Sequence, residues 1–283
     1  MSAADSMMTV LEVLTAANEY LTRSGVENPR LNAEHLLAHV LGKKRLDLYL
    51  QFDRPLGDRE RSPLRELVRR RASGVPLQHL LGTVEFHGRT FLSDPRGLIA
   101  RPETEQLVEW VLAENRECTG PLLDVGTGSG VIAITLALAL PSCPVWATDI
   151  SSDALALARE NAEKHGTALH FSQADLLPAH PLQFAVIVAN LPYIPTGQIP
   201  ELSREVQHDP ATALDGGPDG LRLIERLLAD SPERLLPGGA MYLEVGHDQG
   251  ERVRLMLESA NFRDIRLRSD YQGVQRFLSA KHG

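Results

Sequence analysis

The 283-residue chain lacks most features of secreted, membrane-spanning and cysteine-rich proteins. Its two cysteines, Cys118 and Cys143, are too few for a disulfide framework or a cysteine zinc site, and they suit a reducing compartment. The longest apolar run, Val131–Leu140, has about ten residues and is too short to cross a bilayer. Residues 1–10 carry neither a basic n-region nor an Arg-rich amphipathic pattern, so we expect no signal or transit peptide. The chain is therefore expected to be a cytoplasmic protein without a membrane association.

Positive charge is also scarce, because 37 acidic residues outnumber 29 basic ones and give a formal net charge of -8. Binding long nucleic acids requires clustered Lys and Arg that displace counterions, so we expect no direct contact with nucleic acid. Residues 43–71 are locally basic, but acidic side chains interleave with the arginines. This pattern is typical of a solvated helix face with ion pairs, and it leaves open whether the stretch contacts a protein substrate.

The N-terminal part of the chain shows only helical periodicity. Apolar residues recur at helical spacing, or form a short apolar stretch, in the segments 11–21, 33–41, 46–52 and 64–71. Gly25 and Gly42 follow the first two segments as stop signals. We therefore predict a small helical bundle domain over residues 1–82. Between residues 83 and 100 the pattern changes to apolar residues among glycines and a proline, which suits a β-hairpin linker.

Strands and helices alternate in the third predicted domain, residues 101–283. The expected strands are 122–125, 145–149, 169–173, 184–189, 241–245 and two terminal strands near Ile265 and Val274. The expected helices are 131–140, 154–165, 221–236 and 249–260. Such alternation predicts an α/β fold with a doubly wound, seven-stranded, mostly parallel Rossmann-like sheet. The strand-rich end after residue 260 predicts an antiparallel hairpin at one edge.

A glycine-rich turn follows the first strand of this sheet and opens a helix. Gly126, Gly128 and Gly130 permit a tight turn and let a ligand approach the backbone closely. By itself the triplet could serve NAD, FAD or only a tight turn.

Acidic residues at three strand ends narrow this choice. Asp124 would repel a pyrophosphate but suits the ammonium group of a methionine moiety, and Asp149 is placed to bind both ribose hydroxyls. Asp175 follows the third strand, where it could meet an adenine amino group. A nucleoside without phosphate and with a cationic tail is S-adenosyl-L-methionine, which we predict as the cofactor, with NAD as the main alternative.

The tetrad Asn190-Leu191-Pro192-Tyr193 directly follows the apolar strand 184–189. Ligands of open α/β sheets bind at the carboxyl ends of strands, so the tetrad should face the methyl donor. An asparagine amide can accept a hydrogen bond from an –NH2 group, and a backbone carbonyl can accept its second hydrogen. Tyr193 can supply a flat face against a substrate. Taken alone, the tetrad could also be a structural turn.

Together these motifs resemble the PrmC/HemK family, the N5-glutamine methyltransferases of peptide-chain release factors. The tetrad resembles that family's Asn-Pro-Pro-Tyr, and the resemblance covers nearly the full length. Further matching segments are Gln78-His-Leu-Leu-Gly82, Arg101-Pro-Glu-Thr-Glu105, Asp124–Gly130, Ala213-Leu-Asp-Gly-Gly217 with Asp219-Gly-Leu221, and Glu244-Val-Gly246 with Gln249. Asn-x-Pro-Tyr is shared with adenine-N6 methyltransferases, whereas Arg-Pro-Glu-Thr-Glu after a helical domain is more particular to this family.

The resemblance implies a reaction and a set of site residues. The reaction would methylate N5 of the glutamine in the Gly-Gly-Gln loop of class I release factors, and the helical domain would help to dock that protein. No metal is implied. The expected cofactor-binding residues are Asp124, Gly126, Thr127, Gly128, Ser129, Gly130, Asp149, Asp175, Leu176 and Asn190. The expected substrate-binding residues are Asn190, Leu191, Pro192 and Tyr193, of which Asn190, Pro192 and Tyr193 are the catalytic candidates.

The chain departs from the family pattern at one residue and in one segment. Leu191 stands where the family usually has proline; it keeps the backbone carbonyl, and Pro192 still biases residue 191 toward an extended conformation. His208 and Asp209 lie in a segment that also departs, and they suggest either a metal or acid–base pair or, more simply, a solvated loop. The alternatives kept open are an adenine-N6 nucleic-acid methyltransferase, a glutamine methyltransferase of another protein such as a ribosomal protein, and a binding protein without activity.

Overall fold

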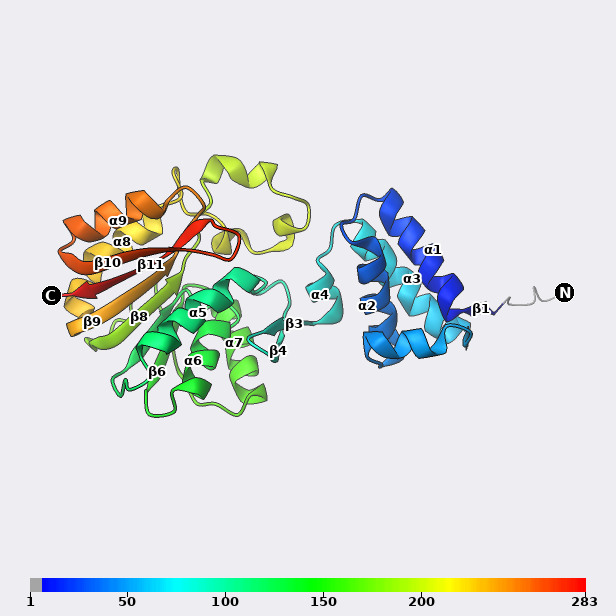
Figure 1. Cartoon of the computed structure of the whole chain (residues 1–283), viewed down its shortest axis with the longest axis horizontal. Coiled ribbons are helices and arrows are strands. Elements are labelled where there is room, and N and C mark those ends of the chain that lie inside the picture. Colours follow the sequence, from blue (N-terminus) through cyan, green and yellow to red (C-terminus); the bar gives the residue numbers. More distant parts are fainter. Residues whose placement is uncertain (1–6) are drawn as a thin grey trace. The chain divides into compact units, whose positions relative to one another are not determined.

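The computed structural model describes residues 7–283, which belong to two compact units. The helical unit extends to Thr83 and also includes Ser203–His208. The sheet unit contains Val84–Leu202 and Asp209–Gly283. Figure 1 shows the helices of the first unit in blue to cyan and the sheet of the second in green to red. None of the helices described in residues 7–283 is long and apolar enough to span a membrane.

Three helices build the helical unit, as the apolar periodicity predicts. They are α1 (Val10–Arg23), α2 (Pro29–Leu41) and α3 (Asp58–Ala72), with a 3-10 turn at Arg45–Gln51 and minimal strands β1 (Met8–Thr9) and β2 (Pro55–Leu56). Thr9 and Glu12 form a capping box that starts α1, and Gly42 ends α2 in the left-handed region. The apolar faces pack into one buried cluster that includes Leu14, Leu36 and Leu64.

Besides its three long helices, the helical unit contains the short helix α4 (Leu77–Leu81), and a hairpin of β3 (Thr83–Phe86) and β4 (Arg89–Leu92) follows this helix. Its two turn residues, His87 and Gly88, both have positive φ, which suits a two-residue hairpin turn. Phe86 and Phe91 are buried, and they belong to a core cluster of the sheet unit. The predicted hairpin is therefore present, and it packs with the sheet.

The sheet unit contains the seven-stranded sheet that the alternation predicts. The strands are β5 (Leu122–Val125), β6 (Val145–Asp149), β7 (His170–Gln173), β8 (Phe184–Asn190), β9 (Leu235–Glu244), β10 (Phe262–Ser269) and β11 (Gln275–His282). Their order is β10-β11-β9-β8-β5-β6-β7. The pairs from β9 to β7 are parallel, and β11 is antiparallel to both β9 and β10. This confirms the antiparallel edge.

Helices cover both faces of this sheet (Figure 1). They are α5 (Pro102–Glu114), α6 (Val131–Ala139), α7 (Ser152–Lys164), α8 (Arg222–Asp230) and α9 (Gly250–Ser259). Alternate strand residues point to opposite faces: Leu122 packs in the cluster with α5 and α6, whereas Leu123 packs in the cluster with α8 and α9. The chain crosses from β7 to β8 beside β5, and this topological switch point is where open α/β sheets bind ligands.

Two predicted element boundaries were wrong, and one helix was not predicted. The helix expected over 221–236 ends at Asp230, because Pro232 follows and β9 already begins at Leu235. The strand expected at 241–245 consequently starts earlier. Helix α5 was not predicted, although Pro102 at its first position and Glu103 in its first turn are helix-start signals.

Candidate active site

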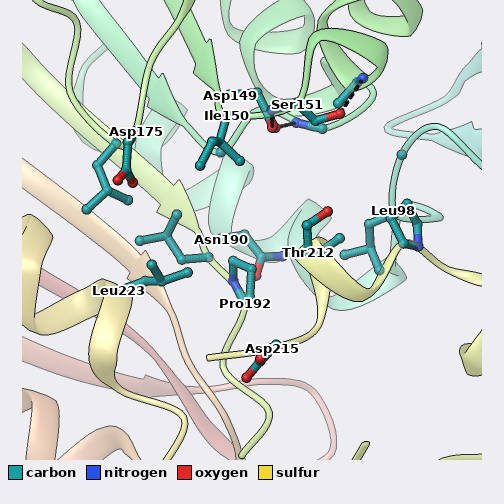
Figure 2. Close-up of a pocket in the computed structure, with 18 of the residues that line it drawn as sticks. Leu98, Asp149, Ile150, Ser151, Asp175, Asn190, Pro192, Thr212, Asp215 and Leu223 are labelled. Carbon is teal, nitrogen blue, oxygen red and sulfur yellow. Dashed lines mark hydrogen bonds between the residues drawn. The ribbon is translucent and has the colours of Figure 1, made fainter. Parts of the chain in front are cut away.

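An open cavity of about 380 Å³ lies at the carboxyl ends of the central strands. The end of each strand contributes one part of the cavity wall: Gly126 and Gly128 after β5, Asp149–Ser151 at the end of β6, Ala174–Leu176 after β7 and Asn190–Pro192 at the end of β8. Figure 2 shows Asn190 and Pro192 at the centre, with Asp149 and Ile150 on one side and Asp175 at one end. The rest of the wall comes from residues 96–98, 210–215 and from α8. A cavity is therefore present at the topological switch point of the sheet.

Asp124 lies behind the glycine loop and is almost completely buried. Its Oδ2 accepts hydrogen bonds from Thr127 Oγ1 at 2.6 Å and from the Ala133 N–H at 3.1 Å. Its Oδ1 has no hydrogen-bond partner among residues 7–283, and burial raises the pKa of the carboxyl to about 7. Thr127, Ser129 and Gly130 are buried beside it rather than on the cavity wall. The structure thus places Asp124 where it can hold the loop in shape.

Asp149 forms part of the cavity wall and is held by two backbone donors. Its Oδ2 accepts from the Gly128 N–H and its Oδ1 from the Ser151 N–H, each at 2.9 Å. Burial raises the pKa of this carboxyl, while the backbone donors lower it. Each carboxylate oxygen can accept a further hydrogen bond. The carboxylate is therefore fixed in position before any ligand arrives.

Two apolar residues, Ile150 and Leu176, line the cavity together with Asp149. Ile150 was not among the predicted site residues. Ile150 is 58% exposed although it is large and apolar. Leu176 is buried with φ +72°, and its carbonyl accepts a hydrogen bond from Thr148 Oγ1 at 2.7 Å. The sequence signal that could have identified Ile150 is its position directly after the acidic end of the strand. These side chains offer apolar surface for a flat ring.

Asp175 also belongs to the cavity wall, but its carboxylate has a partner. Its Oδ2 accepts from an Arg226 N–H at 2.8 Å, and both side chains are about half exposed. A ligand amino group that contacts Asp175 would have to share it with this cation.

Residues far away in the sequence bond to and pack against the backbone of the tetrad. The Tyr193 carbonyl accepts from Gln249 Nε2 at 2.9 Å, and Gln249 Oε1 accepts from the Gly246 N–H at 2.8 Å. A Cβ on Gly216 would lie 2.7 Å from the Pro192 carbonyl oxygen, and one on Gly220 would collide with the Tyr193 carbonyl. The glycine-rich segment 213–221 and the Gln249 motif therefore serve the tetrad. Burial raises the pKa of Tyr193, whose ring lies outside the cavity wall.

Leu191 is buried and packs against the glycine loop. A Cβ on Gly126 would lie 2.9 Å from Leu191 Cδ2, so this close approach requires glycine at position 126. Leu191 also belongs to the core cluster with α8 and α9. The leucine side chain thus links the tetrad to the glycine loop.

Asp209 has a structural role in the sheet unit. Its side chain is fully buried and accepts from an Arg101 N–H at 2.6 Å. Within residues 7–283, no group of three or more His, Cys, Asp or Glu side chains could hold a metal ion. Asp209 therefore anchors Arg101 at the start of α5.

The sheet order, the glycine loop after β5, the acidic end of β6 and the Asn-x-Pro-Tyr tetrad after β8 define a Rossmann-like methyltransferase. Comparisons with known proteins agree with this class. The PrmC N-terminal domain matches residues 12–82, and the methyltransferase small domain matches residues 103–217. A methyltransferase structure from Pyrococcus furiosus shares the fold, with a TM-score of 0.53 and 17% identity over 70% of this chain and 90% of that chain.

Relatives with much higher identity extend over the whole chain. The release factor glutamine methyltransferase of Geobacter sulfurreducens is 40% identical over 285 residues, which are 100% of both chains. That of Deinococcus radiodurans is 40% identical over 97% of this chain and 99% of its own. The chain therefore belongs to the release factor glutamine methyltransferase family, and the PrmC/HemK resemblance is confirmed.

Proposed function

We propose that the protein transfers a methyl group from S-adenosyl-L-methionine to N5 of the glutamine in the Gly-Gly-Gln loop of class I peptide-chain release factors. This modification would support translation termination. The observation that carries the proposal is a single cavity that brings together Asp149, the glycine loop and Asn190. Membership of a family whose relatives act on release factor glutamine supports the same substrate.

The lining of the cavity supports the proposed cofactor. Asp149 would bind the two ribose hydroxyls, and Ile150 and Leu176 would flank the adenine, whose amino group could reach Asp175. Gly126 and Gly128 would leave room for the methionine moiety, with Asp124, Thr127, Ser129 and Gly130 supporting the loop. When bound, the cofactor supplies a sulfonium methyl that is already strongly activated.

The tetrad would provide the substrate site. Asn190 Oδ1 would accept one hydrogen of the glutamine –NH2 group. Gln249 already occupies the Tyr193 carbonyl, and the Pro192 carbonyl faces Gly216, so the Leu191 carbonyl is the backbone acceptor that we assign to the second hydrogen. An amide nitrogen is a poor nucleophile, so catalysis would rest on positioning, desolvation and hydrogen bonds that favour a pyramidal nitrogen. The proton can leave after methyl transfer, so no strong base is needed.

Mass spectrometry of a purified class I release factor tests the proposed substrate. After incubation with the enzyme and labelled S-adenosyl-L-methionine, the peptide that contains Gly-Gly-Gln should gain one labelled methyl group on its glutamine. A ribosomal-protein extract and an adenine-containing oligonucleotide serve as competing substrates. Label in either of these, with an unmodified release factor, would favour the corresponding alternative activity.

We also propose that residues 1–82 dock the protein substrate. A groove of about 270 Å³ lies in the helical unit between α1 and α3. Its floor is apolar, with Val13, Leu64 and Val68, and Arg65 and Arg69 are exposed at its edge. The α3 side of the groove belongs to the basic stretch 43–71 and contributes Arg61, Arg65 and Arg69, so its charge favours an acidic segment of the partner.

Reversing the two exposed charges tests this docking role. The double variant Arg65→Glu/Arg69→Glu should raise the KM for intact release factor by about tenfold, because attraction becomes repulsion at the groove edge. The KM for a short Gly-Gly-Gln peptide should stay the same, since such a peptide lacks the rest of the release factor that would dock in the groove. Arg263→Glu, an exposed arginine on β10, is the matched control. Equal KM values for intact release factor in the wild type and the double variant would contradict docking at this groove.

A further inference from the structure

The Asn190 side chain begins a buried hydrogen-bond chain that leads away from the cavity. Its Nδ2 lies 3.0 Å from Thr104 Oγ1, which in turn lies 2.8 Å from Glu244 Oε2. Thr104 is 3% exposed and Glu244 is 2% exposed, so water does not compete for these bonds. The mechanism described above uses neither residue.

The three residues come from separate motifs that the fold brings together. Asn190 ends β8 and Glu244 ends β9, and these two residues are direct partners in the parallel register. Thr104 lies in the first turn of α5, within Arg101-Pro-Glu-Thr-Glu105. Asp209 pairs with Arg101 and thereby fixes the start of this helix. The hydrogen-bonded residues are thus all held by helices and strands.

The side-chain chemistry decides which group donates and which accepts in each of these hydrogen bonds. A threonine hydroxyl has one proton to donate, and an ionised carboxylate can only accept. The Thr104 proton therefore points to Glu244, and the Thr104 oxygen accepts from the Asn190 –NH2 group. Asn190 also lies close enough to Glu244 to lower the pKa of this carboxyl. A flipped Asn190 would turn its oxygen toward two acceptors, which a buried site strongly disfavours.

We propose that Thr104 and Glu244 are positioning residues that fix the orientation of the Asn190 amide, with Oδ1 held toward the substrate nitrogen. This inference rests on the proposed function and extends it, because it explains why the amide end that faces the cavity is the acceptor. A substrate –NH2 group needs an acceptor, and an Asn190 amide in the opposite orientation would present a donor to it. The preset orientation reduces the reorganisation needed when substrate binds.

Removing the Thr104 hydroxyl tests the inference. Thr104→Val keeps the shape and should lower kcat about tenfold, because Asn190 loses the acceptor that orients it. Thr104→Ser keeps the hydroxyl and should restore most of the turnover. The Kd for S-adenosyl-L-methionine and the Tm, measured on the same full-length proteins, should change little. A wild-type kcat in Thr104→Val, or an equal loss in Thr104→Ser at unchanged Tm, would overturn the inference.

The pH profile of kcat provides a second, independent readout. The pKa of Glu244 is raised to about 7, chiefly because the carboxyl is buried and to a smaller extent because Glu103 lies nearby. Thr104, Arg276 and Asn190 oppose this rise. Tyr193 also lies within electrostatic range. Protonated Glu244 could donate to Thr104 and reverse the chain, so kcat at saturating cofactor should fall as the pH drops through about 7.

Glu244→Gln removes this titration and keeps the shape of the side chain. We expect the variant to lack the acidic limb that the wild type shows near neutral pH, with a reduced kcat above pH 7. The same acidic limb in the variant and the wild type would show that Glu244 does not orient Asn190. All comparisons use the ratio of variant to wild-type turnover on the best available substrate. Failure of the wild type to methylate release factor would instead count against the proposed function.

Discussion

Replacing Asn190 with alanine should lower turnover by about a hundredfold or more, because the substrate amide then loses the contact that orients its nitrogen toward the methyl group. The side chain lines the cavity, and its Nδ2 is bonded to Thr104. Its oxygen is therefore the end that can meet a substrate –NH2 group. The measurement is kcat for intact release factor at saturating cofactor, with a moderate loss of cofactor affinity expected because Asn190 and Gly126 line the same cavity.

Asn115→Ala is the matched control for this experiment. Asn115 lies at the end of α5 and donates to the Val111 carbonyl and to Tyr242, away from the cavity. This variant should lose stability rather than turnover at a permissive temperature. If Asn190→Ala methylates release factor at the wild-type rate, the tetrad is only a turn, and the glutamine assignment fails with it.

The location of the cavity could be predicted from the sequence, because it depends on patterns local in the chain. Apolar runs identify the buried strands, and the residues after them lie at one sheet edge in any parallel arrangement. Gly126, Asp149 and Asn190 therefore line one cavity as expected. The doubly wound sheet follows from the same alternation of strands and helices.

Other features depend on packing between distant segments, which no local pattern shows. The bond from Asn190 to Thr104 requires α5 to lie against the ends of β8 and β9. Asp124 has the residue type and position of a ligand for an ammonium group, but its Oδ2 is turned toward Thr127. The side-chain rotamer decides between these roles, and sequence does not specify it. The missed Ile150 follows the same logic, since its exposure is a tertiary property.

Replacing Asp149 with alanine should weaken S-adenosyl-L-methionine binding by at least tenfold. Each charge-assisted hydrogen bond to a ribose hydroxyl contributes roughly 1.5–3 kcal/mol, and alanine removes the acceptor of both. The Gly128 N–H would also lose the oxygen that fixes the glycine loop, so part of the loss comes from a less ordered site. Calorimetry with the full-length protein measures the affinity, and an unchanged Kd would refute the assignment of Asp149 to the ribose.

Asp149→Asn separates charge from geometry in this contact. Asparagine keeps the shape and one acceptor oxygen but cannot accept from two hydroxyls and two backbone donors together, so its affinity should lie between those of the wild type and the alanine variant. The pH dependence gives the same test in the wild type. Burial raises the pKa of Asp149, and binding needs the ionised form, so affinity should weaken as the pH falls toward that raised value. Because asparagine does not titrate, the part of this pH dependence that comes from Asp149 should be absent from Asp149→Asn.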